Sequence, residues 1–275
     1  MPHARVNGLD LFYRDSGPRN GPTVLFISGL GNDHRAFAAQ ARALSEPAMG
    51  PERSYRCITY DQRDVGQSSL AAAPYTIADL ADDAAGLLAA LGVPAVHVVG
   101  WSMGGAVAQE LALRHPERVR SLALLATYTS SDPRGAARQR SWALLRERLA
   151  PQEYADATWP WVYTVHDYHT PGLMEEALRR VLENPTPQPN EAYRRQVEAV
   201  LGHHTEGRLS AIAAPTLLVF GEEDLLTPMR FARVLAAEVP HARLVTIPRA
   251  GHALLWTHAE LVTMLLRGWL EEVAG

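Results

Sequence analysis

The sequence contains a single cysteine, Cys57, among its 275 residues. One cysteine cannot form a disulfide within the chain, nor can it build a cysteine-based metal site. Long apolar runs are also missing, because no stretch reaches the ~18 apolar residues that a membrane-spanning helix needs. The first eight residues lack the basic and apolar segments of a signal peptide. We therefore expect a cytoplasmic protein without disulfides or a membrane span.

Dense runs of basic residues are absent as well. Lys and Arg total 26 against 30 Asp and Glu, which gives a formal net charge of −4 at pH 7. Nucleic acids and anionic membranes attract a basic face or segment, so we expect neither as a partner. The hydrophobic fraction of 47% is ordinary for a globular enzyme and sufficient for a large core.

Short apolar runs in the first and last parts of the chain indicate the strands of a mostly parallel sheet. Residues 23–27 are almost entirely apolar, as in a strand that is buried on both faces. Residues 4–15 instead alternate around Asn7-Gly8, which predicts an antiparallel hairpin. The other predicted strands are 55–60, 95–99, 122–125, 216–220 and 243–247.

Helical patterns separate these runs. Residues 76–91 carry apolar residues at helical spacing, with Thr76 as a candidate N-cap and Gly92 at the C-terminal end. Strands that alternate with helices predict an α/β fold with βα units and a mostly parallel central sheet. The other predicted helices are 33–45, 103–114, 229–238 and 257–272.

The alternation stops between residues 128 and 212, a segment with helical patterns, several prolines and no convincing strand. Substrate sites in open α/β sheets lie beyond the carboxyl ends of the strands, where this insertion emerges. We interpret it as a lid of about four helices, with an extra helical layer of no functional role as the alternative. The predicted division is a core of residues 1–127 and 213–275 and a lid of residues 128–212.

Residues 100–104 read Gly-Trp-Ser-Met-Gly and lie between a predicted strand and a predicted helix. Glycines two residues before and two after Ser102 permit the sharp turn that exposes a nucleophilic serine. The amide of Met103 would lie at the helix N-terminus, where unpaired N–H groups and the helix dipole favour an oxyanion. We predict Ser102 as a nucleophile and the Met103 N–H as an oxyanion-hole donor.

A nucleophilic serine needs a base, and the base needs a group that orients it. His252 follows the predicted strand 243–247, and Asp224 follows the predicted strand 216–220. All three residues thus fall at carboxyl ends of strands, which predicts His252 as the base and Asp224 as the acid, with Asp132 as the alternative acid. The remaining histidines show no zinc-binding spacing, so we expect no metal and no cofactor.

The loop after strand 23–27 reads Ser28-Gly29-Leu30-Gly31-Asn32. Two glycines let backbone N–H groups turn inward, and the Leu30 N–H is our candidate for the second oxyanion donor. An ordinary glycine-rich turn is the alternative. A nucleotide phosphate loop fits poorly, because no Lys-Ser or Lys-Thr pair follows.

In order and spacing, these segments resemble the α/β-hydrolase superfamily over almost the whole chain. Within it they are similar to lid-bearing esterases, enol-lactone hydrolases, carbon–carbon bond hydrolases and polyketide methylesterases. The resemblance implies an α/β-hydrolase fold, the triad Ser102, Asp224 and His252, and a structural role for Asp61 and Arg63. The matching segments are 28–31, 61–68, 100–105, 221–228 and 251–252.

Two positions depart from the family pattern. Ser28 stands where members often have histidine, which leaves open how the oxyanion loop is held. Asp64 replaces a glycine in the usual Asp-x-Arg-Gly-x-Gly-x-Ser. The serine nucleophile itself argues against haloalkane dehalogenases and epoxide hydrolases, which carry an aspartate at that place.

Aromatic residues gather in the predicted lid and beside the nucleophile. Such rings suit a pocket for a bulky, partly apolar molecule, although they could equally hold the lid helices together. The candidate substrate contacts are Trp101, Trp142, Trp159, Trp161 and Tyr163.

We therefore expect a monomeric or homodimeric serine hydrolase that cleaves a carboxylic ester or lactone of a small molecule through an acyl-enzyme. The alternatives are a carbon–carbon bond hydrolase acting on a ketone, a small-molecule receptor, and a member of the fold that does not hydrolyse its ligand.

Overall fold

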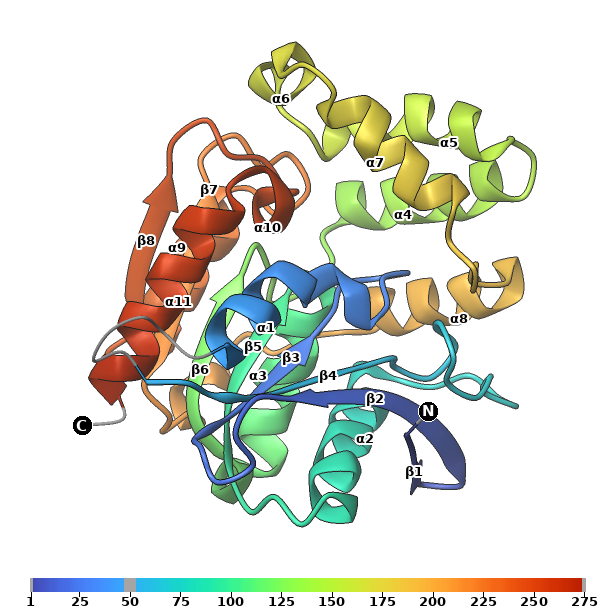
Figure 1. Cartoon of the computed structure of the whole chain (residues 1–275). Coiled ribbons are helices and arrows are strands. Elements are labelled where there is room, and N and C mark those ends of the chain that lie inside the picture. Colours follow the sequence, from blue (N-terminus) through green and yellow to red (C-terminus); the bar gives the residue numbers. More distant parts are fainter. Residues whose placement is uncertain (1, 47–52, 274–275) are drawn as a thin grey trace.

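The computed structural model describes residues 2–46 and 53–273 of the chain. Eight strands form one mixed, mostly parallel sheet with the order β1-β2-β4-β3-β5-β6-β7-β8 (Figure 1). From β4 onward across the sheet, every neighbouring pair is parallel. These strands are β3 (Thr23–Ile27), β4 (Arg56–Tyr60), β5 (Val96–Trp101), β6 (Val119–Leu125), β7 (Thr216–Gly221) and β8 (Arg243–Ile247).

The first two strands, β1 (His3–Val6) and β2 (Leu9–Ser16), form the predicted hairpin at the edge of the sheet. Asn7 and Gly8 have φ angles of 48° and 81°, and a tight type I′ turn requires positive φ at both positions. β2 then pairs antiparallel with β4, which joins the hairpin to the parallel strands.

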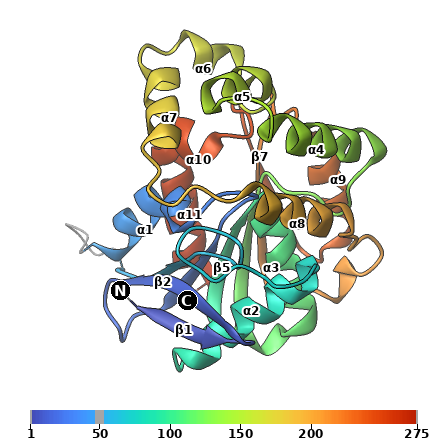
Figure 2. The ribbon, with the colours of Figure 1, turned by 90° about the vertical axis from the view of Figure 1, so that its right-hand side faces the viewer.

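Helices cover both faces of the sheet, which explains why its central strands are apolar throughout. In β3, Leu25 and Ile27 pack into one hydrophobic cluster while Val24 and Phe26 pack into the other. Successive side chains of a strand point to opposite faces, so each cluster occupies one face. Figure 2 shows the strands between the two helical layers.

The first cluster includes residues of α2 (Ile77–Ala90), α3 (Met103–Arg114) and α9 (Met229–Glu238). The second includes residues of α1 (Ala38–Ser45), α10 (Leu254–Thr257) and α11 (Ala259–Val273). Short 3₁₀ turns form η1 (His34–Phe37), η2 (Pro116–Arg118), η3 (Trp159–Trp161) and η4 (Leu209–Ala211).

α2 begins at the predicted cap. The Thr76 hydroxyl accepts the amide N–H of Asp79, and the Asp79 carboxylate accepts the amide N–H of Thr76. This reciprocal pair satisfies two N–H groups that the first helical turn leaves unpaired. At the other end, Gly92 has a φ of 65°, as expected for a glycine that terminates a helix.

Between β6 and β7 the chain forms five α-helices, one more than the sequence indicated. α4 to α7 stand as a group over the core (Figure 1). The two ends of the insertion meet, because Ser130 pairs with His204 and the Thr205 N–H donates to the Thr129 carbonyl at 2.8 Å. The helices are α4 (Pro133–Arg146), α5 (Pro151–Thr158), α6 (Val165–His169), α7 (Leu173–Leu182) and α8 (Asn190–Leu201).

Across the described part of the chain, no helix combines the length and apolar character needed to cross a lipid bilayer.

Candidate active site

Ser102 occupies the sharp turn between β5 and α3. Its φ and ψ of 56° and −121° are unusual for a residue with a side chain and store backbone strain. Gly104 makes the turn possible, since a Cβ there would lie 1.9 Å from the carbonyl oxygen of Ile27. The start of α3 therefore packs directly against β3, with Ser102 at the apex.

Three side chains meet at the carboxyl end of the sheet. Ser102 Oγ lies 2.9 Å from His252 Nε2, and His252 Nδ1 lies 2.8 Å from Asp224 Oδ2. Ser102 follows β5, Asp224 follows β7 and His252 follows β8. This is the arrangement of a nucleophile, a base and an orienting acid.

Asp224 is buried, and its carboxylate is fully hydrogen-bonded. Burial raises the pKa of this carboxyl, but the ion pair with His252 and the bonds from Thr227 lower the pKa further, to below its ordinary value. Oδ1 accepts the N–H groups of Leu226 and Thr227 at 2.7 and 2.8 Å, and Oδ2 accepts the Thr227 hydroxyl at 2.6 Å. An ionised Asp224 favours a proton on Nδ1 of His252, which leaves Nε2 free to accept one.

Asp132, the alternative acid, lies away from the imidazole. Its carboxylate caps α4 by accepting the Gly135 N–H at 2.7 Å, and it forms an ion pair with Arg230. The structure thus brings Asp224 to His252 and commits Asp132 to the start of the insertion.

The predicted oxyanion loop, residues 28–32, lies against Ser102. A Cβ on Gly29 would lie 2.9 Å from the Trp101 ring and 3.2 Å from Ser102 Cβ. Among the hydrogen bonds of the described residues, none uses the amide N–H of Leu30 or of Met103. Both amides are therefore available as oxyanion donors, and their role stays a prediction.

Three polar contacts hold the oxyanion loop in place of the histidine that relatives often carry. The Ser28 hydroxyl donates to the Asp33 carbonyl at 3.0 Å, and the Gln62 amide donates to the Ser28 carbonyl at 2.8 Å. From α8, Gln196 accepts the Gly31 N–H at 3.0 Å. Sequence reasoning missed Gln196, because only the fold brings the insertion to this loop.

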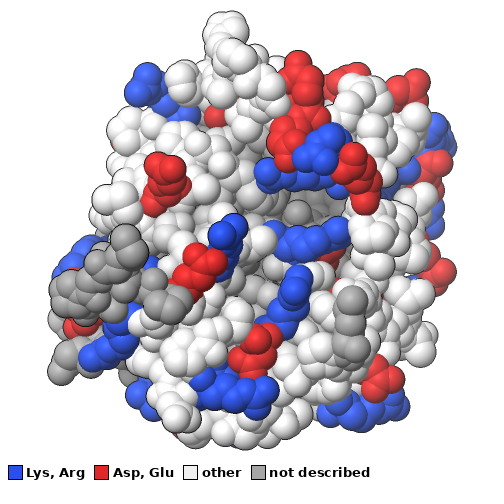
Figure 3. Space-filling view, viewed as in Figure 1, with Lys and Arg blue, Asp and Glu red and all other residues white. Residues whose placement is uncertain are grey.

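Ser102 and His252 open into a pocket lined by residues of both the core and the insertion. On the face seen in Figure 3, a hollow lies between the upper and lower parts of the molecule, with charged side chains around it. Other residues that line the pocket are Tyr128, Asp132, Arg138, Val200, Leu226 and Phe231.

The family described as the alpha/beta hydrolase fold matches residues 22–259. This chain belongs to that family. The match spans strands β3 to β8 and includes Ser102, Asp224 and His252, and the chain is a hydrolase of the α/β fold.

Individual relatives of this hydrolase act on several kinds of bond. "Putative carbamate hydrolase RutD" of Variovorax paradoxus is 31% identical over 274 residues, covering 97% of this chain and 98% of that protein. An esterase from Thermogutta terrifontis has a TM-score of 0.85 at 26% identity, covering 99% of this chain and 98% of that one. The enol-lactonase from Burkholderia xenovorans also has a TM-score of 0.85, at 29% identity, covering 98% and 100%.

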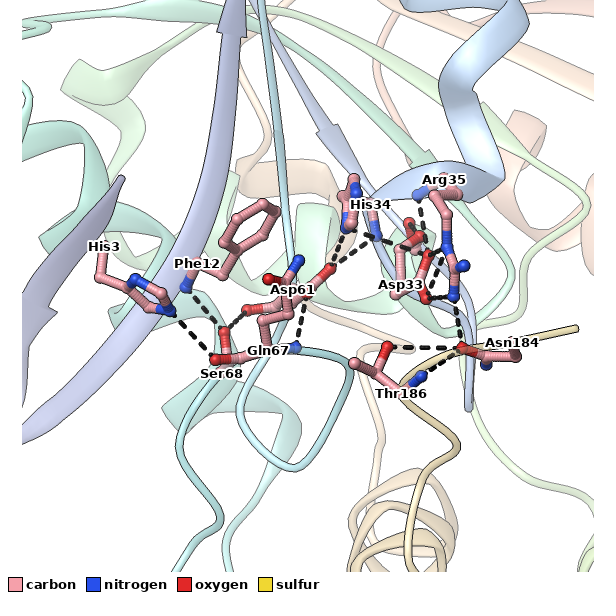
Figure 4. Close-up of polar contacts among 11 residues, drawn as sticks. His3, Phe12, Asp33, His34, Arg35, Asp61, Gln67, Ser68, Asn184 and Thr186 are labelled. Atoms are coloured by element: carbon pink, nitrogen blue, oxygen red, sulfur yellow. Dashed lines mark hydrogen bonds and ion pairs between the residues drawn. The ribbon is translucent and has the colours of Figure 1, made fainter. Parts of the chain in front are cut away.

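Asp61 of the hydrolase connects the segment at His34 with the loop at Gln67 (Figure 4). One carboxylate oxygen accepts the backbone N–H of His34 at 2.8 Å and lies 2.7 Å from His34 Nδ1. The other accepts the Gln67 N–H at 2.8 Å. Arg63 forms two hydrogen bonds with Asp83 at 2.6 and 2.7 Å. These contacts suit the structural roles that the resemblance implies.

One group among the described residues, Asp33, His34 and Asp61, has ligand atoms close enough to share a metal ion. All three are buried, and their oxygens are already used. Asp33 forms an ion pair with Arg35, and Asp61 accepts backbone N–H groups. We therefore assign this cluster to holding the start of η1 in the hydrolase rather than to binding a cation.

The candidate substrate contacts lie at the edges of the site. Trp101 is buried, stacks on His252 with ring centroids 5.3 Å apart, and donates Nε1–H to the His252 carbonyl at 3.1 Å. None of the five aromatic residues is among the described residues that line the pocket, so substrate contact stays a prediction for them. In the insertion, the aromatic pairings are Trp159 with Tyr163, Arg134 over Trp161, and Arg138 over Trp142.

Proposed function

We propose that the protein is a serine hydrolase that cleaves a carboxylic ester or lactone of a small, partly apolar molecule through an acyl-enzyme. The continuous hydrogen-bonded series from Ser102 through His252 to Asp224 carries this proposal. Esterase and lactonase neighbours support it, as does the pocket into which Ser102 opens.

In the proposed mechanism, His252 Nε2 takes the proton of Ser102 as the hydroxyl attacks the substrate carbonyl. Asp224 stabilises the imidazolium that forms. The N–H groups of Leu30 and Met103 hold the oxyanion, each worth ~3 kcal/mol in the transition state. His252 then returns the proton to the leaving alkoxide, and water repeats the sequence to release the acid.

Labelling with a fluorophosphonate probe tests the nucleophile. We expect one adduct per chain, mapped by mass spectrometry to the tryptic peptide that contains Ser102. The Ser102→Ala variant should not be labelled, and its kcat/KM on an activated ester should fall by at least ~10⁴-fold. Full activity of that variant would overturn the mechanism.

A substrate panel separates the proposed reaction from its rivals. Simple esters, lactones, carbamates and 1,3-diketones are compared at equal concentration, with carbamates included because of the full-length similarity to a protein named for that activity. Fastest turnover of a diketone would favour carbon–carbon bond hydrolysis. Tight binding without a burst of acyl-enzyme would favour a receptor, and product formation by Ser102→Ala would favour a non-hydrolytic role.

A further inference from the structure

Arg138 lies on α4 and lines the same pocket as Ser102 and His252. Its side chain is half-buried, and its guanidinium lies over the Trp142 ring, 5.7 Å from the centroid. An arginine stays charged at any physiological pH. The wall of the pocket therefore carries a fixed positive charge from the insertion.

The Arg138 guanidinium has fewer hydrogen-bond acceptors around it than it has N–H donors. Its two hydrogen bonds are long, 3.5 Å to the Leu225 carbonyl and 3.3 Å to the Leu226 carbonyl. The Nε–H is buried and has no acceptor among the described residues. A guanidinium has five N–H donors, and leaving a buried charged donor unpaired is costly. Burial lowers the pKa of Arg138, and the negative charges of Asp132 and Asp224 offset this only in part.

Carboxylates near Arg138 are committed elsewhere. Asp132 pairs with Arg230 and caps α4, and Asp224 pairs with His252. A further cation, Arg134, lies over the Trp161 ring on the same helix. Within the described chain, no carboxylate oxygen comes within 4.0 Å of the Arg138 guanidinium, so Arg138 forms no ion pair.

We propose that Arg138 binds a carboxylate carried by the substrate. The inference rests on the proposed function and names its substrate class: esters or lactones that retain a second, ionised carboxyl group. Arginine suits this task because its planar fork can donate two parallel hydrogen bonds to one carboxylate. The substrate then supplies a carboxylate that can hydrogen-bond to Arg138, while the apolar wall of Val200, Leu226 and Phe231 contacts its carbon chain.

Matched esters test the proposal. Monomethyl and dimethyl esters of dicarboxylic acids, from succinic to suberic, differ only in one ionised carboxyl group. Acetate esters of hydroxy acids and of the corresponding alcohols place that group on the leaving side instead. In at least one series, kcat/KM should favour the anionic ester by about ten-fold or more, mainly through KM.

Substitutions of Arg138 test whether this residue causes the preference for the anionic ester. Arg138→Met keeps most of the side-chain stem and removes the charge, so the anionic-to-neutral ratio of kcat/KM should fall by about ten-fold or more. Arg138→Lys should retain part of the preference, because it keeps the charge without the fork. Arg140→Met removes an exposed arginine from the same helix and should leave the ratio unchanged.

Two results would overturn the proposal: no preference for the anionic ester in either series, or an equal loss of both substrates in Arg138→Met. The second result would mean that Arg138 only supports the loop at Leu225 and Leu226. If Arg138→Met fails to fold, the Arg138→Lys ratio decides. Calorimetry with the monomethyl esters and the Ser102→Ala variant measures carboxylate binding without turnover. Fluorophosphonate labelling tests the nucleophile independently. The two proposals can therefore fail separately.

Discussion

Ser102 owes its exposure to a backbone conformation that its own side chain disfavours. Such a conformation costs about 1–3 kcal/mol and persists only where neighbours hold it. Here the Ser102 N–H donates to the Leu125 carbonyl at 2.9 Å, and the Ser102 carbonyl accepts the Thr127 hydroxyl at 2.7 Å. The strained turn is therefore tied to β6 on one side and continues into α3 on the other.

Single substitutions distinguish Asp224 from Asp132, the two candidate acids that the sequence predicts. Asp224→Asn should lower kcat by at least ~10³-fold, because an amide can donate to His252 Nδ1 and so favour the wrong tautomer. Asp132→Asn should have a far smaller effect, since Asp132 caps α4 and pairs with Arg230. Steady-state rates on one activated ester suffice. A larger loss in Asp132→Asn would reverse the assignment.

Side chains whose role follows from strand ends could be predicted from the sequence. Ser102, Asp224 and His252 each lie within five residues after the end of a strand, so a correct prediction of the sheet brings them together. Thr227, Gln196 and Arg138 could not be assigned, because their partners come from loops or from the insertion. Of these three residues, only Thr227 could have been inferred from the sequence. It lies three residues after Asp224, in a turn whose backbone N–H groups donate to that carboxylate.

At the scale of elements, α8 fastens the insertion to two loops of the core. Arg195 forms two hydrogen bonds with Asp64 at 2.9 and 2.8 Å, and the next residue, Gln196, holds the oxyanion loop. Asp64 is buried and has a φ of 69°, a conformation that glycine adopts easily. The aspartate at the family's glycine position thus keeps the glycine conformation and adds an ion pair to α8.

The Asp64→Gly substitution should have two opposing effects on the free energy of unfolding. Asp64→Gly relieves about 1 kcal/mol of backbone strain but leaves Arg195 without its buried partner, which costs about 3–5 kcal/mol. We expect a net loss of roughly 2 kcal/mol or more in the free energy of unfolding, measured by urea titration, and faster amide exchange in α8. A more stable variant would mean that strain outweighs the ion pair. Arg195→Met, alone and combined with Asp64→Gly, supplies the double-mutant cycle.

Element boundaries were predicted best where caps or apolar runs mark them. The predicted strands 23–27 and 243–247 match β3 and β8 residue for residue. The predicted helix 257–272 corresponds to α11, which begins two residues later because the chain leaves helical geometry at His258, after the short α10. In the insertion, Pro133 and Pro151 begin helices. Proline suits the first helical position because the N–H that it lacks would have no partner within the helix there.

At the scale of the whole molecule, two buried histidines link stability to pH. Burial lowers the pKa of His97 to about 4 and that of His203 to about 3. An unfolded histidine has a pKa near 6.5, so below that pH the unfolded chain binds more protons than the folded one. Stability is therefore complete above about pH 6.5 and falls as the pH drops toward 4.

The His97→Gln variant tests this linkage. Between pH 6.5 and 4.5, His97 and His203 should each lower the free energy of unfolding by roughly 2–3 kcal/mol. The variant should lose that much less than the parent protein over the same range, measured by urea unfolding at each pH. His169→Gln, at an exposed position in the insertion, should leave the slope unchanged. An unaltered slope in His97→Gln would show that His97 is not protonated on unfolding.

The bridge between Ser130 and His204 has a consequence for how such enzymes diversify. Because the two ends of the insertion are pinned side by side, the helices between them form a closed excursion from the sheet. The entropy cost of closing such an excursion grows only with the logarithm of its length. Changes of length among these helices can therefore leave the strand register intact, whereas replacing α8 would also remove the Gln196 contact with the loop of residues 28–32. A graft exchanged at this bridge is the natural unit for transplanting selectivity between relatives.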